Sequence, residues 1–305
     1  MKRSGCVVIL GPTAVGKTVV SLDLAGDIFE IISADSVQVY RYLDIGSGKP
    51  ERSERERVRH HLIDRVEPDV PYTVGDFCRD ADAAVREIAG RGKVPMVVGG
   101  TGLYIDSFFQ GLSDIPDIPI DIREILRDEL RDRGVESMHG ELMRVDPVFG
   151  GRISPRDAQR TLRGLEVYRG TGRPLSSYFN EKRRYGPEDA LFIGLRDERD
   201  PLRERIDRRV EGMMDRGFVE EVRSLRQRGY GPALKSMKSI GYAEIHRFLD
   251  GEMELNETVE RIKTVTKNYA KRQMTWFGKN KRISWFGRTE MDALRELVRQ
   301  WLGGR

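Results

Sequence analysis

The segment that most constrains this chain is a glycine-rich loop near its amino terminus, Gly11-Pro12-Thr13-Ala14-Val15-Gly16-Lys17-Thr18. An apolar run, Cys6–Leu10, precedes the loop, and a stretch of helical character, Val19–Ala25, comes after it. This strand, loop and helix context is the one in which the spacing G-x-x-x-x-G-K-[ST] binds phosphates. The glycines let successive backbone N–H groups point inward, and the start of the helix adds a partial positive charge. The loop therefore predicts a nucleotide-type site for a di- or triphosphate.

Two side chains at the end of the loop carry specific expectations. Lys17 would bring a full positive charge to the terminal phosphates, and the Thr18 hydroxyl would ligate Mg²⁺. All residues from Gly11 to Thr18 are therefore predicted to bind the diphosphate, with Thr18 as the metal ligand. The alternative, a chance match in a turn, would not require a strand and a helix on the two sides.

Length and composition bound the kind of protein that contains this loop. The chain has 305 residues, 38% of them hydrophobic and 33% charged, which is typical of a globular protein with a sizeable core. No apolar run approaches the ~18 residues of a membrane span, and no secretory signal precedes Cys6. The two cysteines, Cys6 and Cys78, fit reduced thiols. We expect a cytoplasmic monomer with no membrane partner.

Two further strand ends are predicted to reach the same edge of a sheet as the loop. Glu30–Ala34 is a predicted strand followed by Asp35, and Val94–Val98 is a predicted strand followed by Gly99-Gly100-Thr101. The carboxyl ends of parallel strands border the ligand crevice of an open α/β sheet. Asp35 is accordingly a candidate general base or magnesium partner, although a turn aspartate would look the same.

The glycines after the later strand set this chain apart from an ordinary phosphate-loop ATPase. Such enzymes usually end this strand in an aspartate that helps to hold magnesium, where this chain has Gly99-Gly100. The glycines would let a backbone or a substrate come close, and Thr101 would supply a hydroxyl at the crevice or an N-cap for the next helix.

The middle of the chain predicts an insertion. Ser113–Pro119 contains two prolines and marks a boundary or hinge, and helical patterns continue from there until the apolar run Ala190–Leu195. The predicted fold class is therefore α/β: a parallel sheet of the P-loop NTPase type, flanked by helices. Its core would comprise residues 1–112 and 189–305, and residues 113–188 would form an all-helical insertion domain. Between 152 and 184 the chain has nine Lys/Arg and three acids, which indicates a solvated face or a surface for a polyanion.

Two positively charged features occur in the carboxyl-terminal third. Arg205 and Arg209 lie four residues apart on one predicted helix, where they would stabilise a leaving group's charge or form surface salt bridges. Residues 261–288 include nine Lys/Arg and no acid, with Tyr269 and other aromatics interleaved. Phosphate contacts combined with aromatic stacking suit single-stranded or loop RNA. Within this stretch, one helical face carries Lys263, Lys267 and Lys271.

Six segments, in order along nearly the whole chain, resemble the tRNA dimethylallyltransferase family, also called the tRNA isopentenyltransferase or IPP transferase family. They are Gly11–Thr18, Asp35-Ser36-Val37-Gln38-Val39-Tyr40, Asp44–Pro50, His60–Asp64, Gly99–Tyr104 and Ala270–Trp276. The chain departs from the family at Ser47-Gly48, where Thr-Ala is common. We expect a bacterial-type enzyme without the zinc-finger extension of some eukaryotic members.

The resemblance implies a prenyl transfer. A dimethylallyl group would pass from dimethylallyl diphosphate to N6 of the adenosine 3′-adjacent to the anticodon of tRNA, with release of pyrophosphate. Asp35 resembles the family's general base, and Thr101 resembles the threonine that holds the target adenosine. Lys17, Mg²⁺ at Thr18 and Arg205 would stabilise the departing pyrophosphate, with Arg209 as the second choice for the arginine.

The resemblance also implies a set of contacts to the tRNA anticodon stem-loop. The target base would have to leave its stack to reach Asp35. The implied tRNA-binding residues are Asp35, Ser36, Val37, Gln38, Thr101, Arg123, Gln159, Arg160, Thr161, Leu162, Arg163, Gly241, Tyr242, Lys271, Arg272, Gln273 and Trp276.

Two other functions share part of these features. A phosphate-loop kinase would use the loop and Asp35 and would turn over ATP, but it would not need the acid-free stretch at 261–288. A nucleotide-gated RNA-binding module without chemistry would keep its RNA affinity in an Asp35→Asn variant. The prenyltransferase hypothesis uses all of the features at once.

Overall fold

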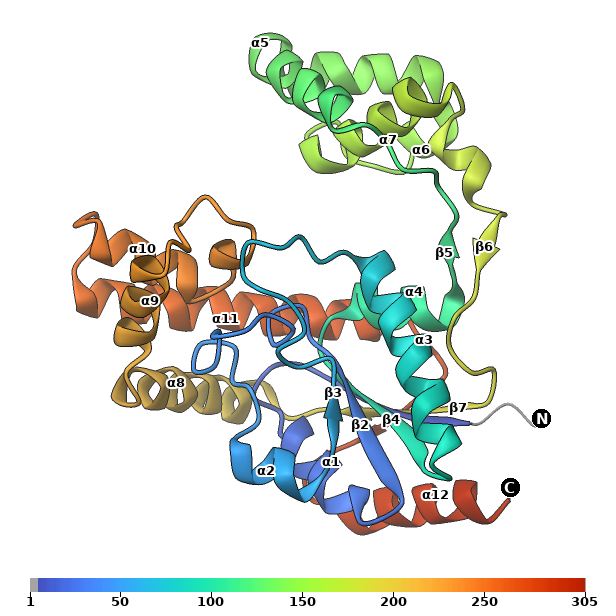
Figure 1. Ribbon diagram of the computed structural model, residues 1–305, viewed down its shortest axis with the longest axis vertical. Helices are drawn as coiled ribbons and strands as arrows, with labels where there is room; N and C mark the ends of the chain where they lie inside the picture. Colours follow the sequence, from blue (N-terminus) through green and yellow to red (C-terminus); the bar gives the residue numbers. More distant parts are fainter. Residues whose placement is uncertain (1–4, 305) are drawn as a thin grey trace. The chain divides into compact units, whose positions relative to one another are not determined.

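The computed structural model describes residues 5–304 and divides the chain into two compact units. One unit joins the residues up to Gln110 with those from Tyr185 onward, and Gly111–Arg184 form the other. The sequence predicts the insertion at residues 113–188. Its predicted start is two residues after the start of the second unit, and its predicted end is four residues after the end of that unit. Figure 1 labels the helices and strands of both units.

The first unit is built on a six-stranded sheet whose strands all run parallel, in the order β3-β2-β4-β1-β7-β8. The strands are β1 (Cys6–Leu10), β2 (Phe29–Ala34), β3 (His60–His61), β4 (Val94–Gly99), β7 (Ala190–Leu195) and β8 (Ile283–Phe286). The sequence predicts the four central strands, which are apolar runs. It does not predict the edge strands β3 and β8, which are short and carry polar or aromatic residues.

Helices cover both faces of this sheet. The helices of this unit are α1 (Lys17–Ala25), α2 (Arg52–Arg57), α3 (Val74–Gly90), α4 (Gly102–Gln110), α8 (Arg199–Asp215), α9 (Phe218–Gln227), α10 (Tyr242–Leu249), α11 (Leu255–Phe277) and α12 (Met291–Gly303). Along β1, Val8 and Leu10 pack in one buried cluster with residues of α3 and α4, whereas Val7 and Ile9 pack in another with residues of α1 and α12. Side chains of a strand alternate between faces, so a strand that is apolar throughout needs a helical layer on each side.

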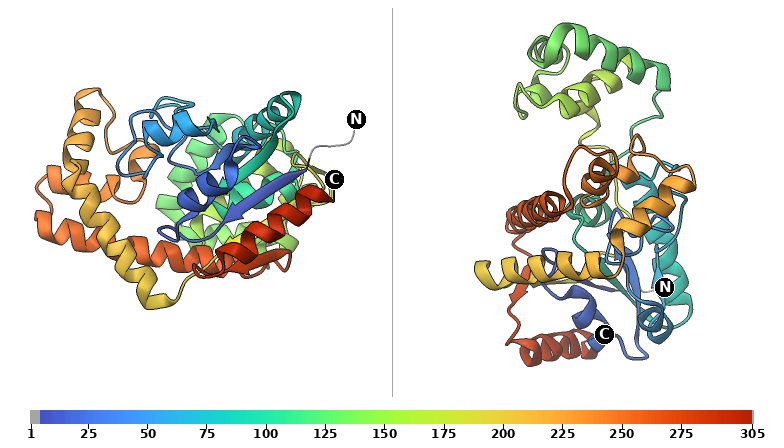
Figure 2. Two further views of the ribbon diagram at one scale, coloured as in Figure 1. Left: turned by 90° about the horizontal axis from the view of Figure 1, so that it is seen from below. Right: turned by 90° about the vertical axis from the view of Figure 1, so that its left-hand side faces the viewer.

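Four helices of this unit, α8 to α11, pack together as a helical subdomain. Helix α11 packs against α8 and α10, and α9 packs against α8 and α10, so the four helices support one another. The left view in Figure 2 shows α8 and α11 as long helices with α9 and α10 at one end. This arrangement places residues from α8 and α11 beside the loops at the strand ends.

The second unit is helical except at its two ends. Its elements are β5 (Leu112–Ser113), α5 (Ile120–Val145), α6 (Pro147–Gly150), α7 (Ala158–Thr171) and β6 (Lys182–Arg183), with a 3-10 turn at Leu175–Tyr178. Within α5, Gly134 has a φ of 74° and interrupts the helix. The two short strands pair antiparallel and were not predicted, because strands of two residues carry no alternating pattern. Within residues 5–304, no helix is both long enough and apolar enough to cross a membrane.

Candidate active site

Three strand ends meet where the sequence predicts the site. In the register of the sheet, Leu10 of β1 and Ala34 of β2 are both partners of Gly99 of β4. The residues after these three positions therefore emerge side by side: the phosphate loop, Asp35, and Gly100 with Thr101. The sequence prediction that these three segments converge depends only on parallel pairing of the strands. The register of the sheet shows that pairing.

The phosphate loop folds back on its own lysine. Gly11 has a φ of 147°, and a Cβ there would lie 2.5 Å from the carbonyl oxygen of Leu195, so only glycine fits. Lys17 Nζ donates to the carbonyl oxygens of Gly11 at 3.0 Å and Pro12 at 2.7 Å. The ammonium group is thus held inside the loop, where a bound phosphate would meet it.

A cavity of about 750 Å³ opens beside the loop. Its lining includes, from the predicted diphosphate-binding set, Thr13, Ala14, Gly16, Lys17, Thr18 and Arg209. From the predicted tRNA-binding set it includes Asp35, Ser36, Val37, Gln38, Gly241, Arg272 and Gln273, and Arg205 lines it as well. Gly11, Pro12 and Val15 are buried and shape the loop from behind.

Positive charge dominates the floor of this cavity. Burial and, to a smaller extent, the charge of the nearby Arg209 lower the pKa of Lys17 to about 7, while Asp35 opposes both effects. Burial also lowers the pKa of Arg209, again with Asp35 opposing. Among the described residues, no carboxylate lies within ion-pair distance of Lys17 or Arg209. These cations are therefore arranged for an anion that the chain does not itself supply.

One oxygen of Asp35 is fixed by the backbone. Asp35 Oδ1 accepts hydrogen bonds from the N–H groups of Val37 at 2.8 Å and Gln38 at 3.2 Å. This is the turn-aspartate geometry that the sequence left open. Over residues 5–304 no hydrogen bond to Oδ2 is found, so the same side chain is both oriented by its turn and able to accept a proton at the cavity.

Thr101 lies beside Asp35 but is not among the described residues that line the cavity. Its Oγ1 accepts a hydrogen bond from the Ser36 N–H at 3.2 Å, and its own N–H donates to Ala34 O at 3.3 Å. Tyr269 of α11 lines the cavity here, and burial together with the Asp35 charge raises the pKa of Tyr269 to about 12, opposed by hydrogen bonds with Thr101 and Gln273. Tyr269 was not among the predicted site residues.

The chain's own residues fill the space left by the glycines after β4. A Cβ at Gly99 would lie 2.1 Å from Ala34 O, one at Gly100 would lie 2.2 Å from Gln273 Nε2, and one at Gly102 would lie 2.4 Å from a ring carbon of Trp276. Groups of the protein itself therefore make these close approaches.

Gln273 joins the phosphate loop to the end of β4. Its Oε1 accepts a hydrogen bond from the Thr13 N–H at 2.9 Å, and its Nε2 donates to Gly100 O at 2.9 Å. The nearby Trp276 donates from Nε1 to Asp106 at 2.8 Å. Both were predicted to contact tRNA; in this structure the Gln273 amide is buried and holds two loops together.

The two candidate arginines of α8 have different surroundings. Arg205 donates from Nε to Ala14 O at 3.0 Å, and its Nη1 forms an ion pair with Asp197, so it braces the phosphate loop. Its buried Nη2 has no hydrogen-bond partner among the described residues. Arg209 is the arginine whose charge acts on Lys17 and Asp35.

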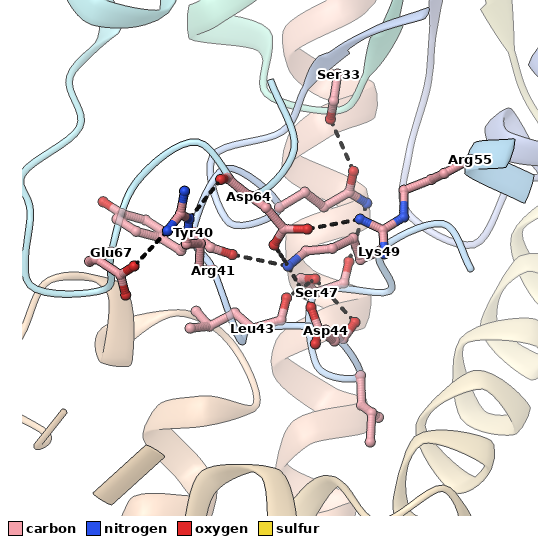
Figure 3. A network of polar contacts seen from close by, with 12 residues as sticks. Ser33, Tyr40, Arg41, Leu43, Asp44, Ser47, Lys49, Arg55, Asp64 and Glu67 are labelled. Carbon is pink, nitrogen blue, oxygen red and sulfur yellow. Dashed lines mark hydrogen bonds and ion pairs between the residues drawn. The ribbon is translucent and has the colours of Figure 1, made fainter. Parts of the chain in front are cut away.

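The loop at residues 44–49 is anchored by a buried lysine. Lys49 Nζ donates to Asp44 at 2.5 Å, to Asp64 at 2.6 Å and to the carbonyl oxygen of Tyr40 at 3.0 Å (Figure 3). Arg55 completes the network through a 2.8 Å bond to the other oxygen of Asp64. Lys49 thus ties the end of this loop to its start at Asp44, and the middle of the loop lines the cavity.

A glutamate of α9 holds the same loop from the other side, and no motif in the sequence singles it out. The Glu221 carboxylate accepts hydrogen bonds from the N–H groups of Asp44, Ile45 and Gly46 at 3.1, 2.7 and 3.3 Å, and from the Tyr242 hydroxyl at 2.7 Å. Tyr242, predicted to bind tRNA, is fully buried by this arrangement.

Part of the acid-free stretch has acidic partners elsewhere in the chain. Lys263 pairs with Glu211 at 2.8 Å and Lys267 with Asp207 at 2.6 Å, both from α8. The sequence places these two lysines in a stretch suited to a polyanion, and in the structure their ammonium groups pair with acids that lie far away in the sequence. Lys271 and Arg272 are exposed.

The predicted tRNA residues of the second unit fall into three groups. Gln159 and Arg160 are exposed on the first turn of α7. Arg123 and Arg163 both bond to the nearly buried carboxylate of Glu166. The remaining two are internal or partly so: Thr161, fully buried, and Leu162, which packs on an apolar cluster.

The paired histidines of β3 have protein partners. His60 Nδ1 lies 2.7 Å from Val58 O, and His61 Nε2 lies 2.8 Å from the Glu30 carboxylate. Burial alone would raise the pKa of Glu30, but hydrogen bonds from Arg91 and His61 outweigh it and lower that pKa to about 2. Both histidines therefore have hydrogen-bond partners within the protein.

The fold and the cavity define a phosphate-loop α/β protein with an anion site next to a carboxylate. An IPP transferase family model matches residues 38–281, and an isopentenyl transferase model matches residues 4–68. The chain belongs to the IPP transferase family.

Named relatives and solved structures agree with this assignment. The chain is 48% identical to a tRNA dimethylallyltransferase 2 of Geotalea uraniireducens over 92% of this chain and 91% of that protein. It is 47% identical to a tRNA dimethylallyltransferase of Geobacter metallireducens, over 93% of each. The tRNA isopentenylpyrophosphate transferase of Bacillus halodurans has 36% identity and a TM-score of 0.73, covering 99% of this chain and 97% of that one. A eukaryotic dimethylallyltransferase, captured in crystallographic snapshots acting on tRNA, has 29% identity and a TM-score of 0.83, covering 99% and 80%.

Proposed function

We propose that this protein transfers a dimethylallyl group from dimethylallyl diphosphate to N6 of the adenosine 3′-adjacent to the anticodon of tRNA, releasing pyrophosphate. It does so as a cytoplasmic monomer. The family membership supports the assignment of the transfer reaction, and so do the names of relatives that align over more than nine-tenths of their length. Each step of the reaction has a candidate residue in the cavity.

The phosphate loop and α8 would hold the diphosphate. Loop N–H groups, Lys17 and Arg209 surround one end of the cavity, and their charges are not neutralised by carboxylates of the described chain. Departure of pyrophosphate concentrates negative charge on its oxygens, and donors fixed in advance stabilise that charge most. We assign this role to Lys17 and Arg209, and we assign to Arg205 the bracing of the loop through Ala14.

The residues beside the loop fit Mg²⁺ on the chemistry of their donors. The Thr18 hydroxyl and the Asp35 carboxylate line the same cavity and offer the hard oxygen ligands that this ion prefers. The described residues contain no cluster of three or more histidines, cysteines and acids for a metal. Mg²⁺ usually keeps water and substrate phosphate as ligands, so a site with few protein ligands suffices. When bound, the ion would neutralise charge on the leaving pyrophosphate.

Asp35 would accept the proton of the attacking amine. An exocyclic adenine amine is a weak nucleophile, so a carboxylate oriented next to it assists as the N–C bond forms. The turn that fixes Oδ1 leaves Oδ2 for this task. Thr101 and Tyr269, packed beside Asp35, would help to position the base after it has left its stack. The exposed Lys271, Arg272, Gln159 and Arg160 would contact the tRNA backbone.

One observation carries the proposal: the cavity joins a phosphate loop to a single strand-end carboxylate, Asp35, while the end of β4 is closed by Gly100 and Gln273. A γ-phosphate transfer would use a magnesium-binding aspartate at that position. A transfer that breaks a carbon–oxygen bond needs only an anion site and a base.

The test is mass spectrometry of nucleosides from unmodified tRNA incubated with the protein, dimethylallyl diphosphate and Mg²⁺. We expect one five-carbon addition on adenosine, slowed about 10²- to 10⁴-fold in Asp35→Asn. The exposed Asp69→Asn serves as the matched control and should react as the wild type. Wild-type protein that adds nothing to tRNA but converts ATP to ADP would replace this proposal with the kinase.

A further inference from the structure

One buried side chain connects two walls of the cavity. Gln273 of α11 accepts a hydrogen bond from the Thr13 N–H of the phosphate loop at 2.9 Å, and it donates to Gly100 O after β4 at 2.9 Å. All three residues line the cavity, and only 5% of Gln273 is exposed. Since a backbone N–H can only donate and a backbone carbonyl can only accept, these partners determine the orientation of the amide. Gln273 therefore spans the gap between the loop and the strand end with both ends of its amide in use.

Helix α11 gives this bridge a firm support. One turn after Gln273, Trp276 donates from Nε1 to Asp106 of α4, the helix that follows β4, at 2.8 Å. Earlier in α11, Lys267 forms an ion pair with Asp207 of α8, the helix that braces the phosphate loop. Because α11 is held on both sides, the amide of Gln273 keeps the phosphate loop and the end of β4 at one separation.

The two ends of the bridge belong to the two halves of the proposed reaction. One end is the phosphate loop with Lys17, which we assign to the diphosphate. At the other end, Gly100 is followed by Thr101. Thr101 Oγ1 accepts from the Ser36 N–H, and Ser36 is next to Asp35. A shift of the loop relative to the strand end would therefore change the distance between the leaving pyrophosphate and the base. A misplacement of ~1 Å between reacting groups can cost about 100-fold in rate.

We propose that Gln273 is a positioning residue for the prenyl transfer: its amide sets the distance between the loop that holds the diphosphate and the strand ends that carry the base. This inference rests on the proposed function, because it takes the loop to hold the leaving group and Asp35 to be the base. It gives Gln273 a task different from the tRNA contact that the resemblance implies. Each substrate by itself contacts only one side of the bridge, so the bridge matters for the reaction of the two rather than for the binding of either.

The experiment replaces Gln273 with methionine, which keeps the length of the side chain but cannot replace the amide as a donor and acceptor. We expect kcat for the modification of tRNA to fall about 100-fold. Affinities for inorganic pyrophosphate with Mg²⁺ and for an anticodon stem-loop, each measured alone by calorimetric titration, should stay within about threefold of the wild type. The exposed Gln300→Met is the matched control and should keep the wild-type kcat.

A second variant tests whether the length of the bridge matters. Gln273→Asn keeps the amide on a side chain that is one methylene shorter, so it can reach either partner but not both. Its kcat should fall about tenfold with both affinities again near those of the wild type. This variant also carries the test if the methionine variant does not fold.

Three outcomes would overturn the positioning role while leaving the proposed function intact. The first is an unchanged kcat in the Gln273 variants. The second is a fall in kcat with an equal loss of stem-loop affinity, which would make Gln273 a tRNA contact. The third is a fall in kcat with an equal loss of pyrophosphate affinity, which would make it part of the anion site. The wild type tests the proposed function separately: protein that binds both ligands but adds nothing to tRNA would overturn the transferase, and the positioning role with it.

Discussion

Helix α8 supplies opposite charges to two neighbouring parts of the protein. Toward α11 it presents Asp207 and Glu211, which pair with Lys267 and Lys263. Toward the cavity it presents Arg209, which has no carboxylate partner among the described residues and lies near another unpaired cation, Lys17. The first set of charges is satisfied within the fold and the second is not.

The difference separates structure from function among residues of one type. Paired charges that are partly buried contribute to stability, and losing one leaves its partner without a counter-charge in an apolar surrounding. Unpaired cations gathered in a cavity raise the free energy of the empty protein, and binding of an anion offsets that cost. Three predictions test this contrast.

The largest effect is expected at the unpaired side. Lys17→Met should weaken binding of pyrophosphate by about 100-fold, because a charge-assisted contact at the centre of the anion site is lost. The melting temperature should change little, since the variant removes a desolvated charge that has no ion pair and, with it, the hydrogen bonds to the carbonyl oxygens of Gly11 and Pro12. Isothermal titration and thermal denaturation of the same samples measure both quantities, and a clear loss of stability would contradict the contrast.

A smaller, opposite effect is expected at the paired side. Lys267→Met should lower the free energy of unfolding by about 1–2 kcal/mol, because Asp207 would lose its cation. Solvent moderates the cost, as 32% of the Asp207 side chain is exposed. The exposed Lys271→Met is the control and should change stability by less than about 0.5 kcal/mol in urea denaturation. Equal losses in both variants would show that the ion pair adds nothing.

The smallest expected effect is a difference of less than one proton in the proton uptake that accompanies binding of pyrophosphate. The pKa of Lys17 is lowered to about 7 in the folded protein, so at about pH 8 this amine is mainly neutral before the anion arrives. Binding of pyrophosphate favours the charged form, and the wild type should take up more protons than Lys17→Met. The difference should disappear below about pH 6, where Lys17 is already charged. Calorimetric titrations in buffers of different ionisation enthalpy measure this difference in proton uptake. Identical uptake by the two proteins would mean that the shifted pKa does not belong to Lys17.

Much of the fold and the centre of the site could be predicted from short-range pattern. Apolar runs identified β1, β2, β4 and β7, and the residues after three of them are the ones that meet at the cavity. These predictions worked because parallel strands pair in register and because the phosphate loop has an obligatory spacing. The edge strands β3 and β8 lack such patterns, and neighbouring strands rather than local preference place them.

The rest of the site depends on contacts between distant segments. Nothing in the neighbourhood of Lys263 reveals that Glu211 neutralises it, and nothing near Gln273 reveals that its amide clamps Thr13 to Gly100. Glu221 was missed for the same reason, since its partners are backbone N–H groups in a loop far away in the chain. Glycines were the available signal: Gly46, Gly48 and Gly100 each mark a position where a distant side chain presses on the backbone.

The pairing of β5 with β6 has a consequence for how the chain closes on itself. Residues 111–184 form a long detour between α4 and β7, yet the two ends of that detour are hydrogen-bonded to each other. Within the first unit, the N–H groups of Tyr185 and Gly186 also return to Phe108 O. Because the two ends of the insertion are held together, joining α4 to β7 costs little more loop-closure entropy than a tight turn would. That entropy depends on the distance between the held ends and not on the residues between them. Evolution can lengthen, shorten or remodel the insertion while β7 keeps its place next to β1.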